Sequence, residues 1–288
     1  MAVPTLRRAP QPRPEVDPPT PRPRAWREFL LVAVLYMAYD GTRLLAKGGD
    51  TRATRHGHDL LRAEQYVHLD WERWLNRMFG AHASLAIPGD YAYAILHYAV
   101  TPVVLIWLFR RHPVTYLRAR TVLAVATLIA LLGFWLLPTA PPRLLGAGFV
   151  DTMSQHANVG WWGADASAPK GMGGMTNEVA AFPSMHVGWA LWCGYYLYRR
   201  AGRRWLRALG VAYPIVMAIV VMGTGNHYFF DALAGCADVI AVGLVVRMIS
   251  TRRLTGGRLL SGRQPRAERP PGTEPAAPRP PEPRAAPR

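Results

Sequence analysis

Lysine and cysteine are nearly absent from this chain of 288 residues, which has only Lys47, Lys170, Cys193 and Cys236. Two cysteines cannot build a disulfide framework, and both lie in apolar runs, where we expect small packing residues. Arginine supplies nearly all of the positive charge behind the net charge of +16. So strong a preference for arginine over lysine is expected from a genome-wide composition bias. The positive charge therefore does not indicate a nucleic-acid partner.

Large apolar residues are scarce at both ends of the chain. Residues 1–24 contain eight prolines and residues 261–288 contain nine, alongside arginine and alanine. Segments of this composition cannot bury a core, so we predict disordered tails at 1–25 and 251–288. The segment between them, 26–250, is strongly apolar and favours a single membrane domain over a soluble globular one.

Six apolar stretches approach the length of about 20 helical residues that crosses a bilayer. They lie at 27–46, 90–109, 119–138, 183–199, 206–224 and 227–248. The first follows a proline-rich tail and lacks a small-residue cleavage site, so we expect an anchor and not a cleaved signal peptide. The predicted fold is an all-α bundle of six transmembrane helices.

Arginine is distributed unevenly among the connections between these stretches. The segments 1–24, 110–120, 199–207 and 252–288 together carry 23 arginines and five acidic residues, whereas 47–90 and 140–182 are nearly balanced. Because excess arginine marks the cytoplasmic side, we expect a multi-pass protein of the cell membrane with both termini in the cytoplasm. An even number of spans agrees with this orientation.

Residues 56–80 have a different pattern, in which apolar side chains recur at helical spacing among charged ones. The apolar positions are Leu60, Val67, Trp71, Trp74, Leu75 and Met78. This pattern predicts an amphipathic helix on the outer side, with its two tryptophans in the headgroup zone. Interfacial packing is the simpler role for this helix, and a lid over a membrane-level site is the alternative.

Unusual polar residues fall at the predicted outer ends of three different spans. Arg143 follows the third span, His186 begins the fourth, and His227 and Asp231 begin the sixth. The predicted topology brings all four to the same face of the membrane, although they are far apart in sequence. Ionisable residues at membrane depth are usually functional, so this convergence predicts a site.

The local chemistry of these residues favours a phosphate ligand. Pro183 fits the first position of a helix, so the amides of Ser184, Met185 and His186 should be unpaired at its N-terminus, where anions bind. The Ser184 hydroxyl and the planar guanidinium of Arg143 would add donors for phosphate oxygens.

His227 and Asp231 are four residues apart and share one helix face. A carboxylate there can hold one ring nitrogen of His227 and leave the other to attack as a nucleophile. A second histidine close by can protonate a leaving alcohol.

The blocks Pro-Ser-Met-His (183–186) and His-x-x-x-Asp (227–231), in this order on a six-helix chain, resemble the type 2 phosphatidic acid phosphatase superfamily. The extended forms Pro-Thr-Ala-Pro-Pro-Arg (138–143), Asn177 before Ala-Ala-Phe-Pro-Ser-Met-His, and Gly-Asn-His-Tyr (225–228) look most like its inositol phosphorylceramide synthase-related branch, which transfers inositol phosphate.

The resemblance implies roles for individual residues. His227 would form a phosphohistidine, His186 would protonate the leaving alcohol and later activate the acceptor, and Asp231 would orient His227. The phosphate-binding residues would be Arg143, Ser184, Met185, Asn177 and Lys170. The resemblance implies no metal and no cofactor.

The sequence departs from the superfamily pattern at three places. Val220 and Val221 stand where Ser-Arg usually precedes the nucleophilic histidine, Leu136 stands where the first block has lysine, and Met185 replaces a glycine. Stabilisation of the phosphate charge should therefore rest more on Arg143, the helix-end amides, Lys170 and Asn177.

We therefore predict a metal-independent membrane phosphatase that acts on a lipid phosphate at the outer face, with membrane lipids as its other partners. The alternative is a lipid phosphotransferase that passes a phosphoryl or inositol-phosphate group to an alcohol. A transporter or channel, and a haem protein with His186 and His227 as axial ligands, are rivals from other classes. The oligomeric state is left open.

Five further polar residues have simpler predicted roles. We expect His56 and His58 in a solvated loop and not at a metal site. Asp40 and Arg43 should pair within the first span, and Asp238 should pair inside the bundle.

Overall fold

The computed structural model describes residues 24–45, 51–163, 170 and 179–261. These residues form helices and one isolated parallel bridge between Thr139 and Ala180, which confirms the all-α class. Two compact units are distinguished, Met1–Met248 and Ile249–Arg288. The first unit holds every residue discussed below, and both predicted tails lie largely outside the described residues.

Four helices in the described part of the chain are long and apolar enough to cross a membrane. They are α4 (Ala83–Arg111), α5 (Pro113–Leu136), α8 (Arg204–Gly223) and α9 (Phe229–Ser261), the last over Phe229–Thr251. Two more helices, α1 (Ala25–Leu45) and α7 (Met185–Arg200), occupy the first and fourth predicted spans. With 16 residues, α7 is shorter than the roughly 20 that cross a bilayer, so the six-span count remains a prediction.

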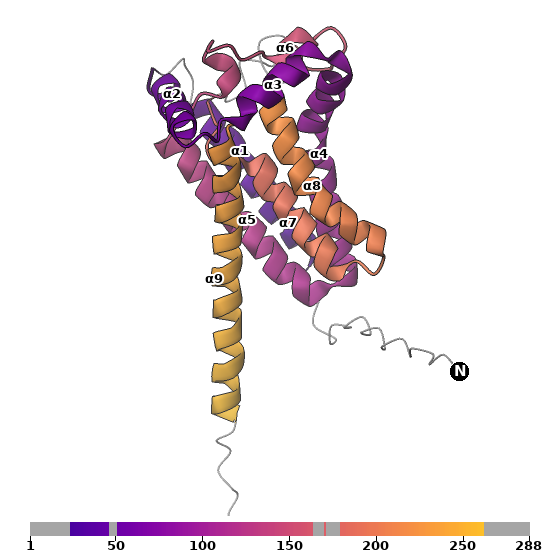
Figure 1. The fold of residues 1–288 in the computed structure, drawn as a ribbon. Coiled ribbons are helices and arrows are strands. Elements are labelled where there is room, and N and C mark those ends of the chain that lie inside the picture. Colours follow the sequence, from indigo (N-terminus) through magenta and orange to yellow (C-terminus); the bar gives the residue numbers. More distant parts are fainter. Residues whose placement is uncertain (1–23, 46–50, 164–169, 171–178, 262–288) are drawn as a thin grey trace, which may run out of the picture. The chain divides into compact units, whose positions relative to one another are not determined.

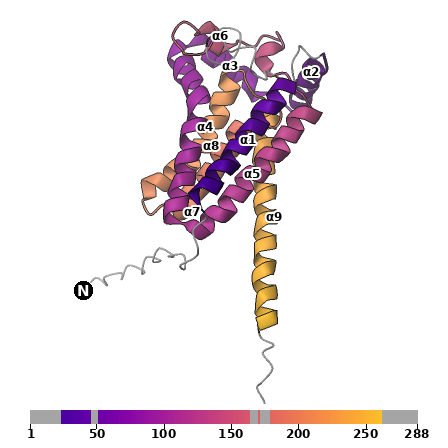
Figure 2. The same cartoon turned by 180° about the vertical axis from the view of Figure 1, so that it is seen from behind.

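Helices α4, α5, α7 and α8 pack together around an apolar core (Figure 1). Fully buried side chains from three of them, Leu108, Trp192 and Met217, lie in this bundle. Helix α1 lies along α5 (Figure 2), where Glu28 accepts a hydrogen bond from the Tyr116 hydroxyl at 2.7 Å. The short helices α2, α3 and α6 gather at one end of the bundle in both views.

The predicted helix at 56–80 is wrong as a single element. The structure has two helices there, α2 (Thr51–Tyr66) and α3 (Trp71–Ala81), with His68 at a positive φ of 58° between them. On α3, Trp71 and Trp74 are more than half exposed, while the polar Asn76 is fully buried. The Asn76 amide supplies the reason: it donates to the carbonyls of Val150 and Gly223, which would otherwise be buried without donors.

Helices α7 and α9 approach each other closely at two glycines. A Cβ on Gly235 would lie 2.0 Å from the Ser184 carbonyl oxygen, and one on Gly188 would lie 2.9 Å from the Gly235 oxygen. The atoms that such a Cβ would meet belong to the backbone, which cannot move aside as the end of a flexible side chain can. The two glycines therefore set the spacing between the helices that begin at Met185 and Phe229.

Gly235→Ala should force α7 and α9 apart. We expect a loss of about 1–3 kcal/mol of stability, typical of overpacking. The matched control is Gly243→Ala on the same helix, where a Cβ meets nothing within 4 Å and alanine should stabilise the helix slightly. Thermal unfolding in detergent checks both variants, and equal melting temperatures would contradict the tight contact.

Candidate active site

Asp231 lies in the first turn of α9, and His227 precedes this helix by two residues, so the two do not share a helix face as predicted. A turn after α8 contains Gly225 at φ +73° and leads into His227, which is buried, as is Asp231. The His227 Nδ1 is 3.1 Å from Asp231 Oδ2 and 3.0 Å from the carbonyl oxygen of Ala181. Because a carbonyl oxygen only accepts, we infer from these partners that Nδ1 carries the proton. The lone pair of neutral His227 is therefore on Nε2.

His186 lies on the first turn of α7 and meets His227 directly. Its Nδ1 is 3.3 Å from His227 Nε2, and the ring centroids are 5.3 Å apart. Since His227 Nε2 bears the lone pair, His186 Nδ1 is the donor in the neutral pair. The structure thus brings together two histidines that are 41 residues apart in sequence. Ring nitrogens in hydrogen-bonding contact are not arranged as axial ligands on opposite sides of one haem iron.

The start of α7 differs from the prediction. We predicted that Pro183 is the first residue of the helix. In the structure Ser184 is the N-cap and the helix begins two residues later than predicted, at Met185. The Ser184 amide donates to the Asp231 carbonyl oxygen at 2.9 Å, so this N–H is not available to an anion. The Ser184 Oγ is buried and has no hydrogen-bond partner among the described residues. Met185 is buried in the apolar core.

Arg143 lies in the 3-10 helix η1 (Pro142–Leu144), beside the turn that carries His227. Its Nε donates to Asn226 Oδ1 at 3.0 Å, and its backbone N–H donates to the Gly225 carbonyl at 2.9 Å. Its Nη1 also donates to Asp151 Oδ2 at 2.9 Å, and this ion pair was not predicted. The Arg143 guanidinium is therefore bonded to Asn226, the residue that directly precedes the predicted nucleophile His227 in the sequence.

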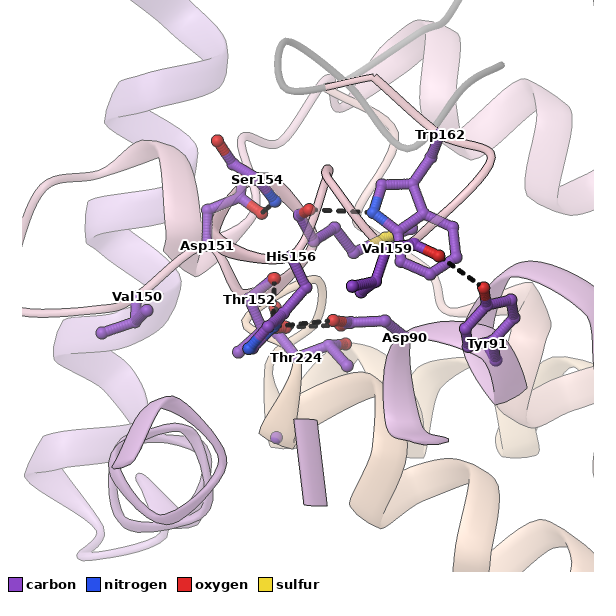
Figure 3. Close-up of polar contacts among 12 residues, drawn as sticks. Asp90, Tyr91, Val150, Asp151, Thr152, Ser154, His156, Val159, Trp162 and Thr224 are labelled. Carbon is purple, nitrogen blue, oxygen red and sulfur yellow. Dashed lines mark hydrogen bonds and ion pairs between the residues drawn. The ribbon is translucent and has the colours of Figure 1, made fainter. Parts of the chain in front are cut away.

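Asp151 is fixed in turn by a polar cluster around helix α6 (Thr152–Gln155), shown in Figure 3. As N-cap, Asp151 accepts from the Ser154 amide at 3.0 Å. The Thr152 hydroxyl donates to the buried Asp90 of α4 at 2.6 Å, and His156 Nδ1 lies 3.4 Å from the other Asp90 oxygen. A connected set of polar contacts thus runs from α4 through α6 to Arg143.

Hydrogen bonds hold the three sequence blocks of the site together. Thr139 donates its backbone N–H to Val179 and accepts from Ala181, at 2.7 and 3.1 Å. The Tyr228 hydroxyl donates to the Ala140 carbonyl at 2.6 Å, and burial raises the pKa of Tyr228 above its ordinary value. These bonds fix the loop before Arg143 to Ala181 and to Tyr228. Ala181 is the residue whose carbonyl accepts from His227, and Tyr228 directly follows His227.

The remaining predicted residues fare differently. Asn177, and the side chains of Asp40 and Arg43, lie outside the described residues. Lys170 is exposed, and its backbone N–H donates to the Trp161 carbonyl at 3.2 Å. The predicted loop at His56 and His58 is wrong: both lie on α2, and His56 Nδ1 bonds the Pro138 carbonyl at 2.8 Å. No hydrogen bond to the buried Asp238 Oδ2 is found among the described residues, contrary to the pairing we predicted.

A buried pair of carboxyl groups, Glu64 of α2 and Glu72 of α3, lies against the start of α9. Glu64 Oε1 accepts from the Phe230 amide, next to Asp231. Burial, and then the neighbouring Glu72 carboxyl, raise the pKa of Glu64 to about 10, and burial also raises the pKa of Glu72. Both fall among the charged positions of the amphipathic pattern at 56–80, and nothing in the local sequence indicates that they are buried.

The Glu64 proton makes stability depend on pH. The folded chain keeps it up to about pH 10, whereas the unfolded chain loses it near the ordinary value of 4.5. Between these values the folded state binds the extra proton, so its stability falls as pH rises, by up to about 1.4 kcal/mol per pH unit.

We expect Glu64→Gln to flatten this dependence, because glutamine stays neutral and keeps an oxygen for the Phe230 amide. Relative to wild type, the variant should gain most in melting temperature at about pH 9 and least at about pH 5. Asp59→Asn, at an exposed position of α2, is the control and should leave the slope unchanged. Parallel curves for wild type and Glu64→Gln would show that Glu64 ionises normally.

Among the described residues, no three His, Cys, Asp or Glu side chains are arranged to hold a metal ion. The described residues instead bring two imidazoles, a carboxylate and a nearby arginine together at the end of an apolar helix bundle. Groups of these kinds can carry out nucleophilic and acid–base chemistry.

The sequence profile of the PAP2 superfamily matches residues 58–245, which is most of the chain. The chain therefore belongs to the PAP2 superfamily. No curated protein and no solved structure matches it. Membership indicates an enzyme, a phosphatase or phosphotransferase that acts on lipid phosphates, and the four apolar helices agree with a membrane protein.

Proposed function

We propose that this protein is an integral membrane phosphatase that cleaves a lipid phosphate through a phosphohistidine on His227. The observation that carries the proposal is the orientation of this ring. Asp231 and the Ala181 carbonyl hold Nδ1, and Nε2 is directed at a second histidine. This is the arrangement of a nucleophile with an orienting acid behind it and a proton donor in front.

The reaction takes place in two steps. His227 Nε2 attacks phosphorus, the bond to the lipid oxygen breaks, and that oxygen takes a proton from the imidazolium form of His186, which becomes neutral. Water then attacks the phosphohistidine, His186 accepts the proton of the water, and the phosphorus–nitrogen bond breaks to release phosphate. The Asp231 carboxylate stabilises the positive charge that His227 acquires in the intermediate.

The phosphate would be bound by Arg143 and by the start of α7. The buried Ser184 Oγ, which has no partner among the described residues, is a donor for a phosphate oxygen. A phosphate that contacts Arg143 competes with Asp151 for the guanidinium. Met185, Lys170 and Asn177 complete the proposed set.

The proposed topology has six spans, with α1 and α7 added to the four long helices and both termini in the cytoplasm. The uneven distribution of arginine supports this orientation, because the arginine-rich connections all fall on one side. The active site would then lie at the outer face, under α2 and α3. The exposed Trp71 and Trp74 suit an outer membrane interface.

The alternative is a lipid phosphotransferase of the inositol phosphorylceramide synthase-like branch. It is favoured by the blocks Pro-Thr-Ala-Pro-Pro-Arg (138–143) and Gly-Asn-His-Tyr (225–228), which resemble that branch. In this case an alcohol such as inositol, and not water, would receive the phosphoryl group, or the inositol-phosphate head group would itself be transferred.

The test uses the full chain in lipid vesicles with a metal chelator and a panel of lipid phosphates, each with and without inositol. A phosphatase releases inorganic phosphate whether or not inositol is present, and a phosphotransferase forms a new phosphorylated product only with the acceptor. The absence of both products across the panel would contradict the proposal. Activity that disappears with the chelator would contradict the metal-independent mechanism.

A further inference from the structure

Helix α4 places two rings against His186. The Tyr93 ring stacks on it with centroids 4.4 Å apart and an interplanar angle of 22°. The His97 ring meets it edge-on, at 4.3 Å and 73°. Neither residue belongs to the sequence blocks that identify the site, and His97 adds a third histidine that is buried like His227, whereas His186 is half-buried.

The His97 ring is itself held in one orientation. Its Nδ1 lies 3.0 Å from the Tyr93 carbonyl oxygen, which can only accept, so Nδ1 carries a proton. On its other sides are Tyr98, at 3.8 Å between centroids, and Trp189, at 6.1 Å. Trp189 is fixed by a hydrogen bond from its Nε1 to Thr127 Oγ1 at 3.1 Å.

His186 needs such support because its hydrogen bonding differs from that of His227. A carboxylate and a carbonyl orient His227. Among the described residues, the hydrogen bond found for the His186 ring is the one to His227, the group that it serves. This bond must break when a phosphorus atom comes between the two rings, and His186 then has only its packing against α4 to keep it within reach of the reacting oxygen.

We infer that His97 is a positioning residue for His186, and that it acts together with Tyr93 to hold the imidazole for proton transfer. The inference rests on the proposed function, since it gives His97 a role only if His186 is the acid and base of a two-step reaction. If His97 has this role, replacing it should slow only the steps in which His186 transfers a proton.

Those steps can be separated by the choice of substrate. An alkyl lipid oxygen is a poor leaving group and needs the proton of His186 when phosphohistidine forms. The nitrophenolate of p-nitrophenyl phosphate leaves without one. Hydrolysis of phosphohistidine needs His186 with either substrate, because water must lose a proton.

The variants are His97→Leu, which removes the ring, and His97→Phe, which keeps a ring edge against His186. For His97→Leu we expect lipid turnover to fall about 10- to 100-fold with little change in KM, within the range of general acid–base catalysis. The initial burst of nitrophenol should be preserved, and acid-labile phosphohistidine should accumulate. His97→Phe should recover part of the lipid turnover.

Thr101→Val is the matched control, one turn further along the buried face of α4, where the Thr101 hydroxyl contacts Cys193 Sγ at 3.7 Å. It should leave both substrates unaffected. The inference is overturned if His97→Leu keeps wild-type lipid turnover, if it lowers the burst and the lipid turnover equally, or if Thr101→Val has the same effect. A wild-type protein that turns over both substrates without phosphohistidine would instead refute the proposed function, and the inference with it.

Discussion

His227→Ala is expected to abolish turnover of every lipid phosphate that the wild-type protein cleaves. Nε2 of this ring is the proposed nucleophile, and no other buried imidazole in the described residues has a carboxylate behind it and a second imidazole in front. Removing the nucleophile of a covalent mechanism typically lowers kcat by a factor of about 10⁴ or more. The phosphohistidine should disappear together with the activity.

The measurement is phosphate release and acid-labile phosphate on the protein after rapid quenching. His82→Ala is the control, because His82 is an exposed histidine between α3 and α4 whose Nδ1 bonds the local Met78 carbonyl. It should keep wild-type rates. A His227→Ala variant with full activity would rule out a covalent intermediate on this residue.

Asp231→Asn is expected to have the second largest effect. The amide keeps the size of the side chain but loses the charge that stabilises the phosphorylated, positively charged imidazole. An asparagine NH₂ facing Nδ1 also favours the tautomer with its proton on Nε2, which is no nucleophile. Replacing the acid of a comparable histidine–aspartate pair lowers kcat by as much as about 10⁴, and we expect a loss of about 10² to 10⁴ here.

Asp238→Asn provides the matched control on the same helix, seven residues further along α9. Asp238 has a buried Oδ2 without a partner among the described residues and makes no contact with His227 that would require its charge. Its amide variant should stay within about threefold of wild type, as expected away from the reacting groups. Equal losses for the two variants would mean that the charge of α9 matters and not the contact with His227.

Local sequence rules predicted the parts of the site that depend on spacing alone. His227 and Asp231 are four residues apart, and their side chains are in contact as predicted, although His227 precedes α9 and is not on a helix. The meeting of His186 with His227 followed from the order of apolar helices, because both residues begin a helix at the same end of the bundle. Four apolar helices of spanning length could be found in the same way.

Residues whose position depends on distant partners could not be found from sequence. Glu64 and Glu72 follow the charged pattern of a surface helix, and only the arrangement of α2 and α3 against α9 buries them. Asp151 is remote from the histidine blocks and is recognised only through Arg143. At Pro183 a sound local rule failed because the amide of the next residue bonds the Asp231 carbonyl.

The contact between His186 Nδ1 and His227 Nε2, 3.3 Å long, has a consequence for substrate selection. Two ring nitrogens in direct contact leave no room for a phosphorus atom between them. The two imidazoles must therefore separate before a bound phosphate can react. Part of the intrinsic affinity for the phosphate is consumed in this rearrangement, which lowers the observed affinity. A headgroup anchored by its own acyl chains stays at the site longer and separates the rings more often, so a soluble phosphate ester should need a higher concentration to reach the same rate.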